Sequence, residues 1–417
     1  MKAQNLGSKI RHEFPIFKNN EKKGDGQIKP FVYLDTAVTG QKPQSVIQAM
    51  TKYMETDYGS VHRGAYGVSI RSSKMYEDTR EKVAKFIGSS VDANQVIFTK
   101  GTTESLNIVA HGISELFLDD KSRIVIPTIE HHANLIPWQQ AALRKDCELA
   151  YLSLEGKQSS KLKINLKEAE QFITKNTKVV AFAHVGNVIG QINPVEELIA
   201  LAKKVGALVV IDCAQSMSSH DEDLFAMGAD AIAFSGHKLY GPTSIGVLAM
   251  KKELVDRLPP YLFGGGMISD VNLEQSLWTT GPAKFEAGTQ PITEACGLSA
   301  AIDWVESKGR TNILNHSSGL ASLFLEKLKN IPDIEVFSPQ SGKETIVSFR
   351  HKKIHAHDMA TILDFDNVAM RAGHHCAWPL IRNLGVDALV RCSFGAYSDG
   401  DDVEIAIEAI KNSVKRV

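Results

Sequence analysis

The sequence predicts an α/β fold in which a mainly parallel sheet is followed by a smaller α+β unit. The chain has 417 residues, which is too many for one small core at roughly 150 residues per domain. Between about Phe31 and Asp303, short apolar runs alternate with helical patterns. Such alternation is typical of βαβ units and a parallel sheet. We therefore expect a large domain at 24–304 and a small domain made of 1–23 and 305–417.

The predicted strands of the large domain are short and apolar on both faces, as buried parallel strands are. They are residues 96–99, 123–126, 179–182, 207–211, 229–234 and 245–249. Helical patterns open at Gly101 and cover 194–205 and 292–308. Residues 345–350 and 389–394 predict strands of the small domain. The polar, glycine-containing stretches 19–29 and 155–161 predict loops.

Composition excludes several classes of function. A net charge of −1 without a basic cluster leaves no electrostatic footprint for nucleic acid. No apolar run approaches the ~20 residues that span a bilayer, and the N-terminus lacks the apolar core of a signal peptide. The five cysteines include no Cys-x-x-Cys pair, which is typical of a reducing cytoplasm rather than a disulfide framework.

Lys238 is the first candidate for chemistry. It follows the predicted strand 229–234 in a turn of small residues that presents the side chain. A flexible amine at the end of a core strand suits Schiff-base chemistry, provided that its surroundings disfavour the charged form. Most lysines are solvated surface groups, so Lys238 needs support from other residues.

Asp212 supplies that support, because it stands directly after the predicted strand 207–211. A carboxylate at the end of a buried strand is costly unless it meets a cation or a hydrogen-bond donor. A protonated pyridine nitrogen is such a partner, and Gln215 is near enough in sequence to reach a ring hydroxyl.

A third feature predicts a phosphate site. Gly101, Thr102 and Thr103 follow the predicted strand 96–99 and open a helix. Glycine permits a tight turn, and the free N–H groups of a helix start bind anions. A Gly-Thr-Thr turn alone is more often plain capping. Together, the lysine, the aspartate and the cradle point to pyridoxal phosphate.

The chain also resembles a known family. Seven segments appear in the order typical of that family: 61–64, 101–104, 130–134, 184–187, 235–242, 285–289 and 371–377. On these segments the chain resembles the SUF-type (group II) cysteine desulfurases and the related selenocysteine lyases. These are class V aminotransferase-like pyridoxal-phosphate enzymes of the aspartate-aminotransferase fold (fold type I). The resemblance implies a seven-stranded, mainly parallel sheet in the large domain.

The resemblance also implies roles around the cofactor. His131 is expected to stack on the pyridine ring, Asp212 to pair with its nitrogen, and Gln215 to contact its ring oxygen. The phosphate would be held by Thr102 or Thr103, Ser235 and His237. Thr289 resembles a residue that reaches the phosphate of a neighbouring subunit, which implies a homodimer.

Substrate roles follow in the same way. Arg391 resembles the clamp for the carboxylate of L-cysteine, because its planar fork suits bidentate pairing. Asn187 is expected to contact the substrate or the ring oxygen. The further substrate-binding candidates from the matched segments are His62, Arg63 and Arg371.

Cys376 is the expected nucleophile, in a glycine-containing loop after His374 and His375. A free cysteine is only a few per cent thiolate at neutral pH, so we expect these histidines and Arg371 to provide a favourable field. A zinc site is disfavoured, because adjacent residues rarely converge on one ion and no fourth ligand has a standard spacing. Buried structural thiols are the simpler interpretation for the other cysteines, Cys147, Cys213, Cys296 and Cys392.

The resemblance thus implies conversion of L-cysteine to L-alanine, with Lys238 and His131 catalytic and sulfur held as a persulfide on Cys376. It implies sulfur supply for iron–sulfur cluster assembly in the cytoplasm, through a SufE-like or SufU-like acceptor. The chain departs from the usual family pattern at Val38, Gln290, Pro291 and Ser398, which puts substrate preference and rate in doubt. Selenocysteine lyase and cysteine sulfinate lyase activities stay open, as does a sulfur-carrier scaffold without activity.

Overall fold

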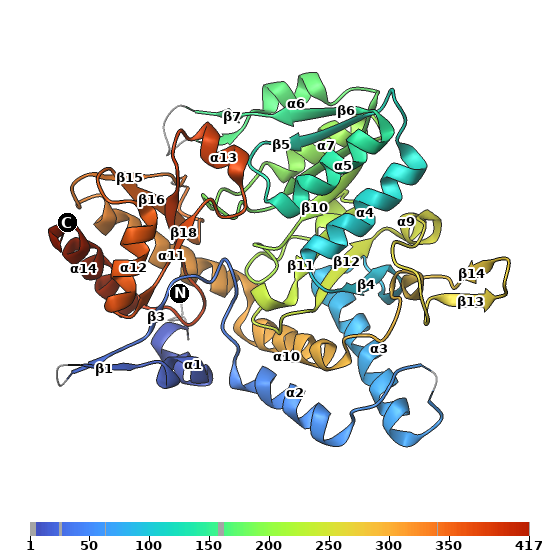
Figure 1. Cartoon of the computed structure of the whole chain (residues 1–417), viewed down its shortest axis with the longest axis horizontal. Coiled ribbons are helices and arrows are strands. Elements are labelled where there is room, and N and C mark those ends of the chain that lie inside the picture. The colour runs from blue at the N-terminus through green and yellow to red at the C-terminus, as the bar shows by residue number, and fades with distance from the viewer. Residues whose placement is uncertain (1–5, 25–26, 63, 157–161, 340, 417) are drawn as a thin grey trace.

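The computed structural model describes residues 6–24, 27–62, 64–156, 162–339 and 341–416. Its centre is a seven-stranded sheet with the strand order β4-β12-β11-β10-β9-β5-β6 (Figure 1). The strands are β4 (Val96–Thr99), β5 (Arg123–Pro127), β6 (Glu148–Leu152), β9 (Thr177–Ala183), β10 (Leu208–Asp212), β11 (Ala231–Ser235) and β12 (Gly246–Met250). The predicted α/β class with a mainly parallel sheet is confirmed.

One strand of this sheet is reversed. β12 pairs antiparallel with both β11 and β4, so β4 runs in the same direction as β11, and the remaining pairs are parallel. The carboxyl ends of six strands therefore meet at one edge of the sheet. In open α/β sheets ligands bind beyond this edge, which makes it the place to look for a site.

Successive residues of the central strands pack on opposite faces. In β10, Val209 and Ile211 join one hydrophobic cluster and Val210 joins the other. The first cluster includes side chains of α3 (Gly67–Ile87), α7 (Val195–Lys204) and α10 (Ile292–Lys308). The second includes side chains of α4 (Thr102–Phe117), α5 (Ile136–Lys145) and α9 (Lys252–Arg257). Burial on both faces explains why these strands read as continuous apolar runs.

A second, four-stranded antiparallel sheet lies at the end of the molecule that holds both termini (Figure 1). Its order is β15-β16-β19-β18, and it contains the two strands predicted for the small domain. The strands are β15 (Ile334–Val336), β16 (Ile346–His351), β18 (Arg371–Gly373) and β19 (Leu389–Ser393). A third hydrophobic cluster joins this sheet to α11 (Arg310–Leu328), α12 (Ala356–Phe365) and α14 (Gly400–Arg416).

The remaining elements are short strands and connecting helices. β3 (Val32–Tyr33) pairs in parallel with β17 (Val368–Ala369). Two further pairs are antiparallel: β7 (Leu154–Glu155) with β8 (Lys163–Ile164), and β13 (Ile268–Val271) with β14 (Ser276–Trp278). The helices are α1 (Pro15–Asn19), α2 (Gln44–Thr56), α6 (Leu166–Phe172), α8 (Leu224–Met227) and α13 (Trp378–Asn383). The division at 304/305 stays a prediction, and α10 runs across it to Lys308.

The loop prediction for 19–29 was wrong, because β1 (Lys22–Gly24) and β2 (Gln27–Lys29) form a short antiparallel pair. The pair is polar except for Gly24 and the exposed Ile28, so it lacks the alternation that marks a half-buried strand. In the predicted loop 155–161, Glu155 ends β7, and 157–161 lie outside the described residues.

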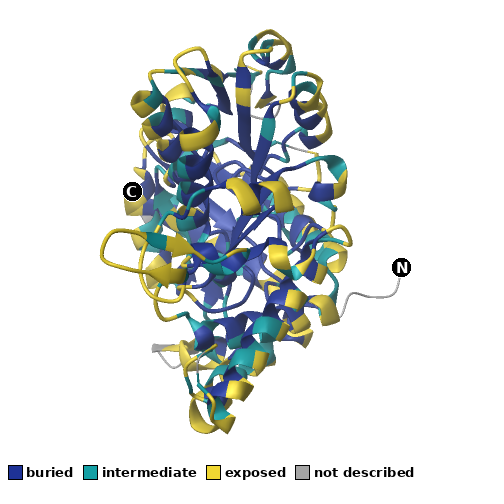
Figure 2. Ribbon diagram, turned by 90° about the vertical axis from the view of Figure 1, so that its right-hand side faces the viewer, coloured by how far each residue is buried: buried dark blue, intermediate teal, exposed yellow. Residues whose placement is uncertain are grey.

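Burial is greatest in the strands of the large sheet, and the exposed residues gather on the outer helices and connections (Figure 2). Of the other cysteines, Cys213 and Cys392 are buried as expected, whereas Cys147 and Cys296 are only partly buried. Within the described residues, no helix combines the length and the apolar character that crossing a membrane requires.

Candidate active site

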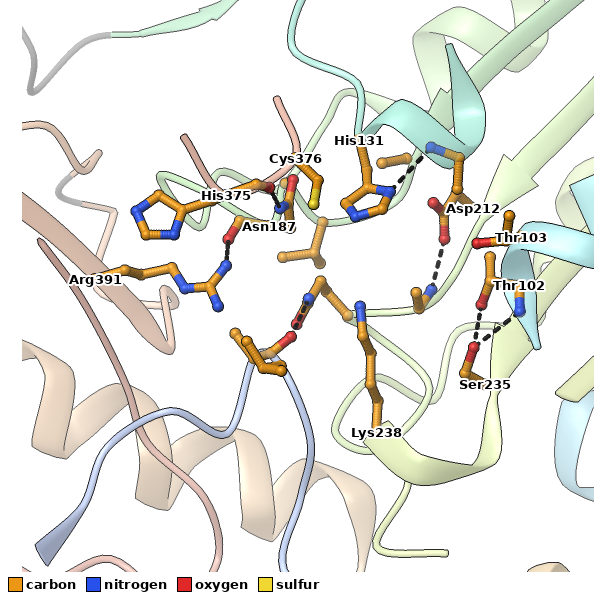
Figure 3. A pocket seen from close by; sticks show the side chains of 18 of the residues that line it. Thr102, Thr103, His131, Asn187, Asp212, Ser235, Lys238, His375, Cys376 and Arg391 are labelled. Carbon is orange, nitrogen blue, oxygen red and sulfur yellow. Dashed lines mark hydrogen bonds between the residues drawn. The ribbon is translucent and has the colours of Figure 1, made fainter. Parts of the chain in front are cut away.

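A cavity of about 360 Å³ lies beyond the carboxyl edge of the large sheet, between it and the small sheet. Figure 3 shows Thr102, Thr103 and Ser235 on one side of this pocket, and Arg391 and Cys376 on the opposite side. Lys238 extends between the two groups. The pocket therefore brings together most of the residues singled out in the sequence, from segments far apart in the chain.

Lys238 ends a single helical turn, Gly236–Lys238, directly after β11. Protein atoms surround its amine, and this burial lowers the pKa of Lys238 to about 8, against the opposing effect of Asp212. The side chain reaches the cavity. A lysine with such a pKa has a substantial uncharged fraction near neutral pH, as an amine that attacks a carbonyl needs.

Asp212 is the last residue of β10 and is buried. Its Oδ1 accepts a hydrogen bond from the Ala214 N–H at 2.9 Å, while the carboxylate also faces the cavity. Burial raises the pKa of Asp212, and the Ala214 N–H and the charge of Lys238 lower it. A cationic donor in the cavity would offset the cost of this buried charge.

The start of α4 forms the predicted cradle. Gly101 is the N-cap, and the N–H of Thr102 donates to Ser235 Oγ at 2.8 Å, while their hydroxyl oxygens are 2.7 Å apart. The strand partner of this turn is Gly246, where a Cβ would collide with Gly101, so the turn lies close against β12. Free N–H groups and hydroxyls thus converge at the positive end of a helix, which is a ready anion site.

His131 lies in the turn after β5 and lines the cavity. Its Nδ1 accepts from the Ala133 N–H at 3.0 Å, which leaves the proton on Nε2. Burial lowers the pKa of His131 to about 3, with help from the charge of Lys238. His131 is therefore a neutral ring, suited to packing on a flat ligand.

Glu130, directly before His131, is a buried residue to which we assigned no role from the sequence. Its carboxylate accepts from Asn134 Nδ2 at 2.6 Å and from the Ala183 N–H at 3.0 Å. Burial raises the pKa of Glu130 to about 8. These contacts join the His131 turn to β9. In the sequence, the feature that could have indicated a role for Glu130 is a carboxylate soon after an apolar strand, as at Asp212.

The two amide side chains predicted for the site line the cavity, and both are held by backbone carbonyls. Gln215 Nε2 donates to the Ala37 carbonyl at 2.7 Å, and Asn187 Nδ2 donates to the His375 carbonyl at 2.7 Å. An amide nitrogen carries two hydrogens, so each retains a donor for a ligand. The bond from Asn187 also ties the Cys376 loop to the large sheet.

Arg391 lies in β19 and is 2% exposed. Its guanidinium donates to the Asn187 carbonyl at 2.7 Å and to Asp35 at 3.4 Å, while its Nε is buried without a hydrogen-bond partner. Arg371 makes a closer pair with the same Asp35, at 2.9 Å. Asp35 thus bridges the two arginines, and the sequence provided no sign of this contact.

Cys376 is exposed and lies in the loop between β18 and α13. Its φ is 55° and that of His375 is 52°, so two consecutive non-glycine residues adopt the left-handed conformation. A left-handed backbone conformation at a non-glycine residue costs free energy, and it persists only where the surrounding structure holds it in place. The Cys376 carbonyl accepts from the His132 N–H at 2.8 Å, which holds the loop beside the His131 turn.

The expected contribution of the adjacent histidines to the field at Cys376 was wrong for His375. Burial lowers the pKa of His375 to about 3, and its Nε2 lies 3.1 Å from the Leu389 carbonyl, so the ring carries no charge near neutral pH. His374 instead stacks on Trp378, with ring centres 4.3 Å apart. A thiolate at Cys376 would favour the charged forms of Lys238, Arg371 and Arg391, which form the positive surroundings.

Two of the predicted residues do not line this pocket, and a third is not described. His62 is exposed, with its ring edge-on to Tyr76 at 6.0 Å, and Thr289 is exposed in the loop before α10. Neither lines the cavity within one chain. Arg63 lies outside the described residues. Among those that are described, no group of three or more metal-ligating side chains could hold an ion.

The departures from the family pattern fall in different surroundings. Val38 lines the cavity, so its bulk faces the site. Gln290 donates to the carbonyls of Glu286 and Gly288, and Pro291 is the N-cap of α10. Ser398 is buried, and its Oγ accepts from the Gly395 N–H at 3.2 Å. Only Val38 of the four can touch a ligand in the pocket.

The donor set fits pyridoxal phosphate. The buried amine of Lys238, whose pKa is lowered, lies between the anion cradle and the guanidinium of Arg391. The buried carboxylate of Asp212 lies beside this amine and has an unfilled acceptor position. The ring of His131, which is flat and neutral, also faces the cavity. These are the groups that an aldehyde, a phosphate, a pyridine nitrogen and an aromatic face require.

Comparison with known proteins identifies the family. The family model described as "Aminotransferase class-V" matches residues 32–405. A relative named cysteine desulfurase, from Haloferax volcanii, is 39% identical, and the match covers 96% of this chain and 95% of the relative.

Two solved structures are similar along nearly the whole chain. The apo cysteine desulfurase from Thermococcus onnurineus NA1 is 35% identical with a TM-score of 0.91, covering 100% of both chains. The cysteine desulfurase CsdA from Escherichia coli, in an S-sulfonic acid form, is 32% identical with a TM-score of 0.89, covering 98% of both. The chain therefore belongs to the class-V aminotransferase family, among the cysteine desulfurases, and is a pyridoxal-phosphate-dependent enzyme.

Proposed function

We propose that this chain is a SUF-type cysteine desulfurase that converts L-cysteine to L-alanine and takes the sulfur as a persulfide on Cys376. The observation that carries the proposal is the exposed thiol of Cys376 at a pocket that also holds the buried pair Lys238 and Asp212. A pyridoxal-phosphate enzyme without sulfur transfer has no need for a thiol at that position.

The cofactor would be held by the cradle at Thr102, Thr103, Ser235 and His237, by Asp212 at the ring nitrogen and by Lys238 at the aldehyde. Joined to the amino group of a substrate, pyridoxal phosphate withdraws electrons from Cα and so makes bonds at Cα and Cβ labile. His131 covers one face of the ring, and Gln215 and Asn187 offer donors to the ring oxygen or substrate.

Lys238 moves the proton. With its amine free, a pKa of about 8 would let Lys238 accept the Cα proton near neutral pH and return a proton later. Asp212 stays close enough to influence that pKa. The same two residues therefore set the pH range over which the reaction runs.

Cys376 receives the sulfur. Its thiolate attacks the substrate sulfur, an S–S bond forms, and the Cβ–S bond breaks. The electron pair of the broken bond stays with Cβ, which takes up a proton and becomes the methyl group of alanine. The cationic side chains Lys238, Arg371 and Arg391 lie close enough to Cys376 for a charge on its sulfur to act on each of them.

Arg391 would bind the carboxylate of L-cysteine. Its buried Nε has no partner, and a carboxylate in the pocket would satisfy it. Arg371, 46% exposed at its side chain, shares Asp35 with Arg391 and is nearer the mouth. We assign Arg371 to guiding the substrate in. His62, which does not line the cavity of its own chain, would reach a pocket from another subunit.

A homodimer is part of the proposal. Thr289 is exposed and does not line the cavity of its own chain, as expected of a residue that meets the phosphate of a partner subunit. Large apolar side chains are exposed nearby in sequence, at Phe263, Leu273, Leu277 and Trp278. Such exposure around β13 and β14 is typical of a surface that another chain covers.

The acceptor of the sulfur would be a SufE-like or SufU-like protein that supplies iron–sulfur cluster assembly in the cytoplasm. A persulfide is discharged by an attacking thiolate, so the acceptor must present a cysteine to Cys376. The partly exposed ring of Trp378, two residues further on, offers that protein an apolar contact. Five free cysteines are compatible with a reducing compartment.

Incubation with L-cysteine, an alanine assay and mass-spectrometric mapping of the persulfide test the whole proposal. We expect alanine to appear and one added sulfur on Cys376. A persulfide on another cysteine, or alanine formation without L-cysteine sulfur on the protein, would contradict it. Selenocysteine lyase activity is distinguished by a Cys376→Ala variant that keeps turnover of selenocysteine but loses that of cysteine. A scaffold would not bind the cofactor at all.

A further inference from the structure

Lys42 is a partly buried lysine that the reaction described above does not use. It lies in the segment between β3 and α2, the segment whose residues Ala37 and Val38 line the cavity. Its ammonium donates to the carbonyls of Gly40 and His237 and to the hydroxyl of Thr39. No carboxylate among the described residues lies within 4.0 Å of it, the limit for an ion pair. The protein groups that solvate this charge among the described residues are neutral oxygens.

The carbonyl of His237 is the centre of this arrangement. It accepts from Lys42 Nζ at 3.0 Å, from the Gly40 N–H at 2.9 Å and from Thr39 Oγ1 at 3.1 Å. All three donors come from the segment 39–42. His237 directly precedes Lys238 and faces the phosphate cradle together with Ser235. The Lys42 ammonium is thus hydrogen-bonded to the backbone carbonyl of His237, a residue that lines the anion site.

The charges of two lysines, Lys42 and Lys238, act on His237 at this end of the pocket. Burial lowers the pKa of Lys42 to about 8, with no opposing anion. The pKa of His237 is lowered to about 4 by burial and then by the charges of Lys238 and Lys42. Lys238 has Asp212 as an anionic neighbour, whereas Lys42 has no such neighbour. A buried cation without an anion is costly unless one arrives with a ligand.

We propose that Lys42 is the countercharge of the cofactor's phosphate, acting through the carbonyl and ring of His237. The dianion bound at Thr102, Thr103 and Ser235 supplies the negative charge that the Lys42 ammonium lacks. Lys42 is a positioning residue, because it touches the cradle only through His237. The inference depends on cofactor binding in this pocket, and extends it to a residue outside the cavity wall.

Binding of two ligands to the full-length apoprotein tests the proposal. Pyridoxal phosphate carries the dianion, and pyridoxal carries the same ring and aldehyde without it. In Lys42→Met and Lys42→Gln, we expect the Kd of pyridoxal phosphate to rise about tenfold, the size of one partly screened charge interaction, while the Kd of pyridoxal stays within about twofold. Absorbance titration measures both, and thermal melting shows that each variant is folded.

Two further variants separate charge from hydrogen bonding. Lys42→Arg keeps the charge and should keep the preference for the phosphorylated ligand. Thr39→Val removes another donor to the same carbonyl but no charge, so it should change both affinities alike or neither. If Lys42→Met does not fold, Lys42→Gln, which keeps a neutral donor, carries the comparison.

Three results would overturn the proposal. If Lys42→Gln weakened the binding of pyridoxal and of pyridoxal phosphate equally, the role of Lys42 would be structural only. Unchanged affinity for pyridoxal phosphate would show that the phosphate does not sense the charge. A selective loss in Thr39→Val would assign the effect to the hydrogen bonds of His237. The wild type serves as reference: if it bound no pyridoxal phosphate, the cofactor site itself, not only Lys42, would be wrong.

Discussion

Asp212 ends β10 and Lys238 follows the adjacent parallel strand β11, and the carboxylate and the amine act on one another across the pocket. Asp212 pairs in register with Ala233 of β11, the strand that leads into Lys238. Burial alone would favour the uncharged form of both groups, and each opposes that tendency in the other. The balance holds the pKa of Lys238 at about 8 rather than lower.

This balance predicts how cofactor capture depends on pH. Only the uncharged amine of Lys238 attacks an aldehyde, and raising the pH through about 8 increases that form. The rate at which apoprotein takes up pyridoxal phosphate should therefore rise with pH up to about 8 and level off above it. Below that value the rate should fall about tenfold per pH unit. Stopped-flow absorbance measures it, and a flat profile between pH 6.5 and 9 would contradict the assignment.

Removal of the amine should be decisive. Lys238→Ala is expected to bind pyridoxal phosphate without a covalent link, so borohydride reduction should leave no labelled peptide. In the wild type the label should map to Lys238 alone. A Lys251→Ala variant, on the far end of β12, provides the control and should label normally. Label on any other lysine of the wild type would disprove the central assignment.

Asp212→Asn preserves the shape of the side chain and its acceptor for the Ala214 N–H but removes the charge. We expect the cofactor to remain bound and kcat to fall about 10²-fold or more, because an electrostatic partner of the ring nitrogen is lost. Steady-state alanine production gives the rate. Asp146→Asn, the same change at a left-handed helix C-cap far in sequence from the pocket, should leave kcat unaltered. Equal kcat in both variants would remove Asp212 from the mechanism.

Cys376→Ser should abolish persulfide formation while leaving the visible absorbance of the bound cofactor intact. The reason is that Cys376 lies in a loop of the small sheet and contributes no hydrogen bond to the cradle. The loss in cysteine turnover should be about 10²-fold or greater, as expected for a nucleophile. Cys296→Ser, which changes a partly buried thiol that lines no pocket, should retain activity. Persisting turnover at the wild-type rate in Cys376→Ser would refute its role.

Arg391→Lys tests the carboxylate clamp. A lysine keeps the charge but not the two-pronged geometry, so KM for L-cysteine should rise about tenfold or more, with a smaller change in kcat. The cofactor spectrum should stay unchanged, because Arg391 lies across the pocket from the cradle (Figure 3). Arg350→Lys, whose partner Glu335 is on the neighbouring strand, is the matched control. An unchanged KM would argue for another carboxylate site.

The buried pair Arg80 and Glu286 should matter for stability rather than catalysis. Glu286 accepts from Arg80 at 2.7 Å and from the Phe98 N–H at 2.8 Å, which connects α3 and β4 to the loop that carries Thr289. Glu286→Gln removes the buried carboxylate from the buried Arg80 and leaves it the more exposed Glu77 as ionic partner, and we expect a loss of about 3 kcal/mol in unfolding free energy. Urea denaturation measures it. Asp78→Asn, which breaks the exposed pair with Lys74, should not shift the urea midpoint.

Much of the fold follows from local pattern. Runs such as 96–99 and 207–211 are apolar on both faces, and this alone predicts buried strands, which the structure confirms within about two residues. The ends of those strands then point to Asp212 and Lys238, since polar groups after a core strand must meet a partner. The reversal of β12 was not predictable, because an antiparallel strand within the same layer is equally apolar.

By itself the sequence determined which segments are buried strands and where chemistry-bearing residues follow them, because burial and turn formation depend on neighbours along the chain. The tertiary structure decided what those residues meet. It makes His375 neutral, joins Asp35 to two arginines, and leaves Lys42 without an anion. Charge state and pairing depend on how closely distant segments enclose a group, and that enclosure exists only once the two sheets have packed together.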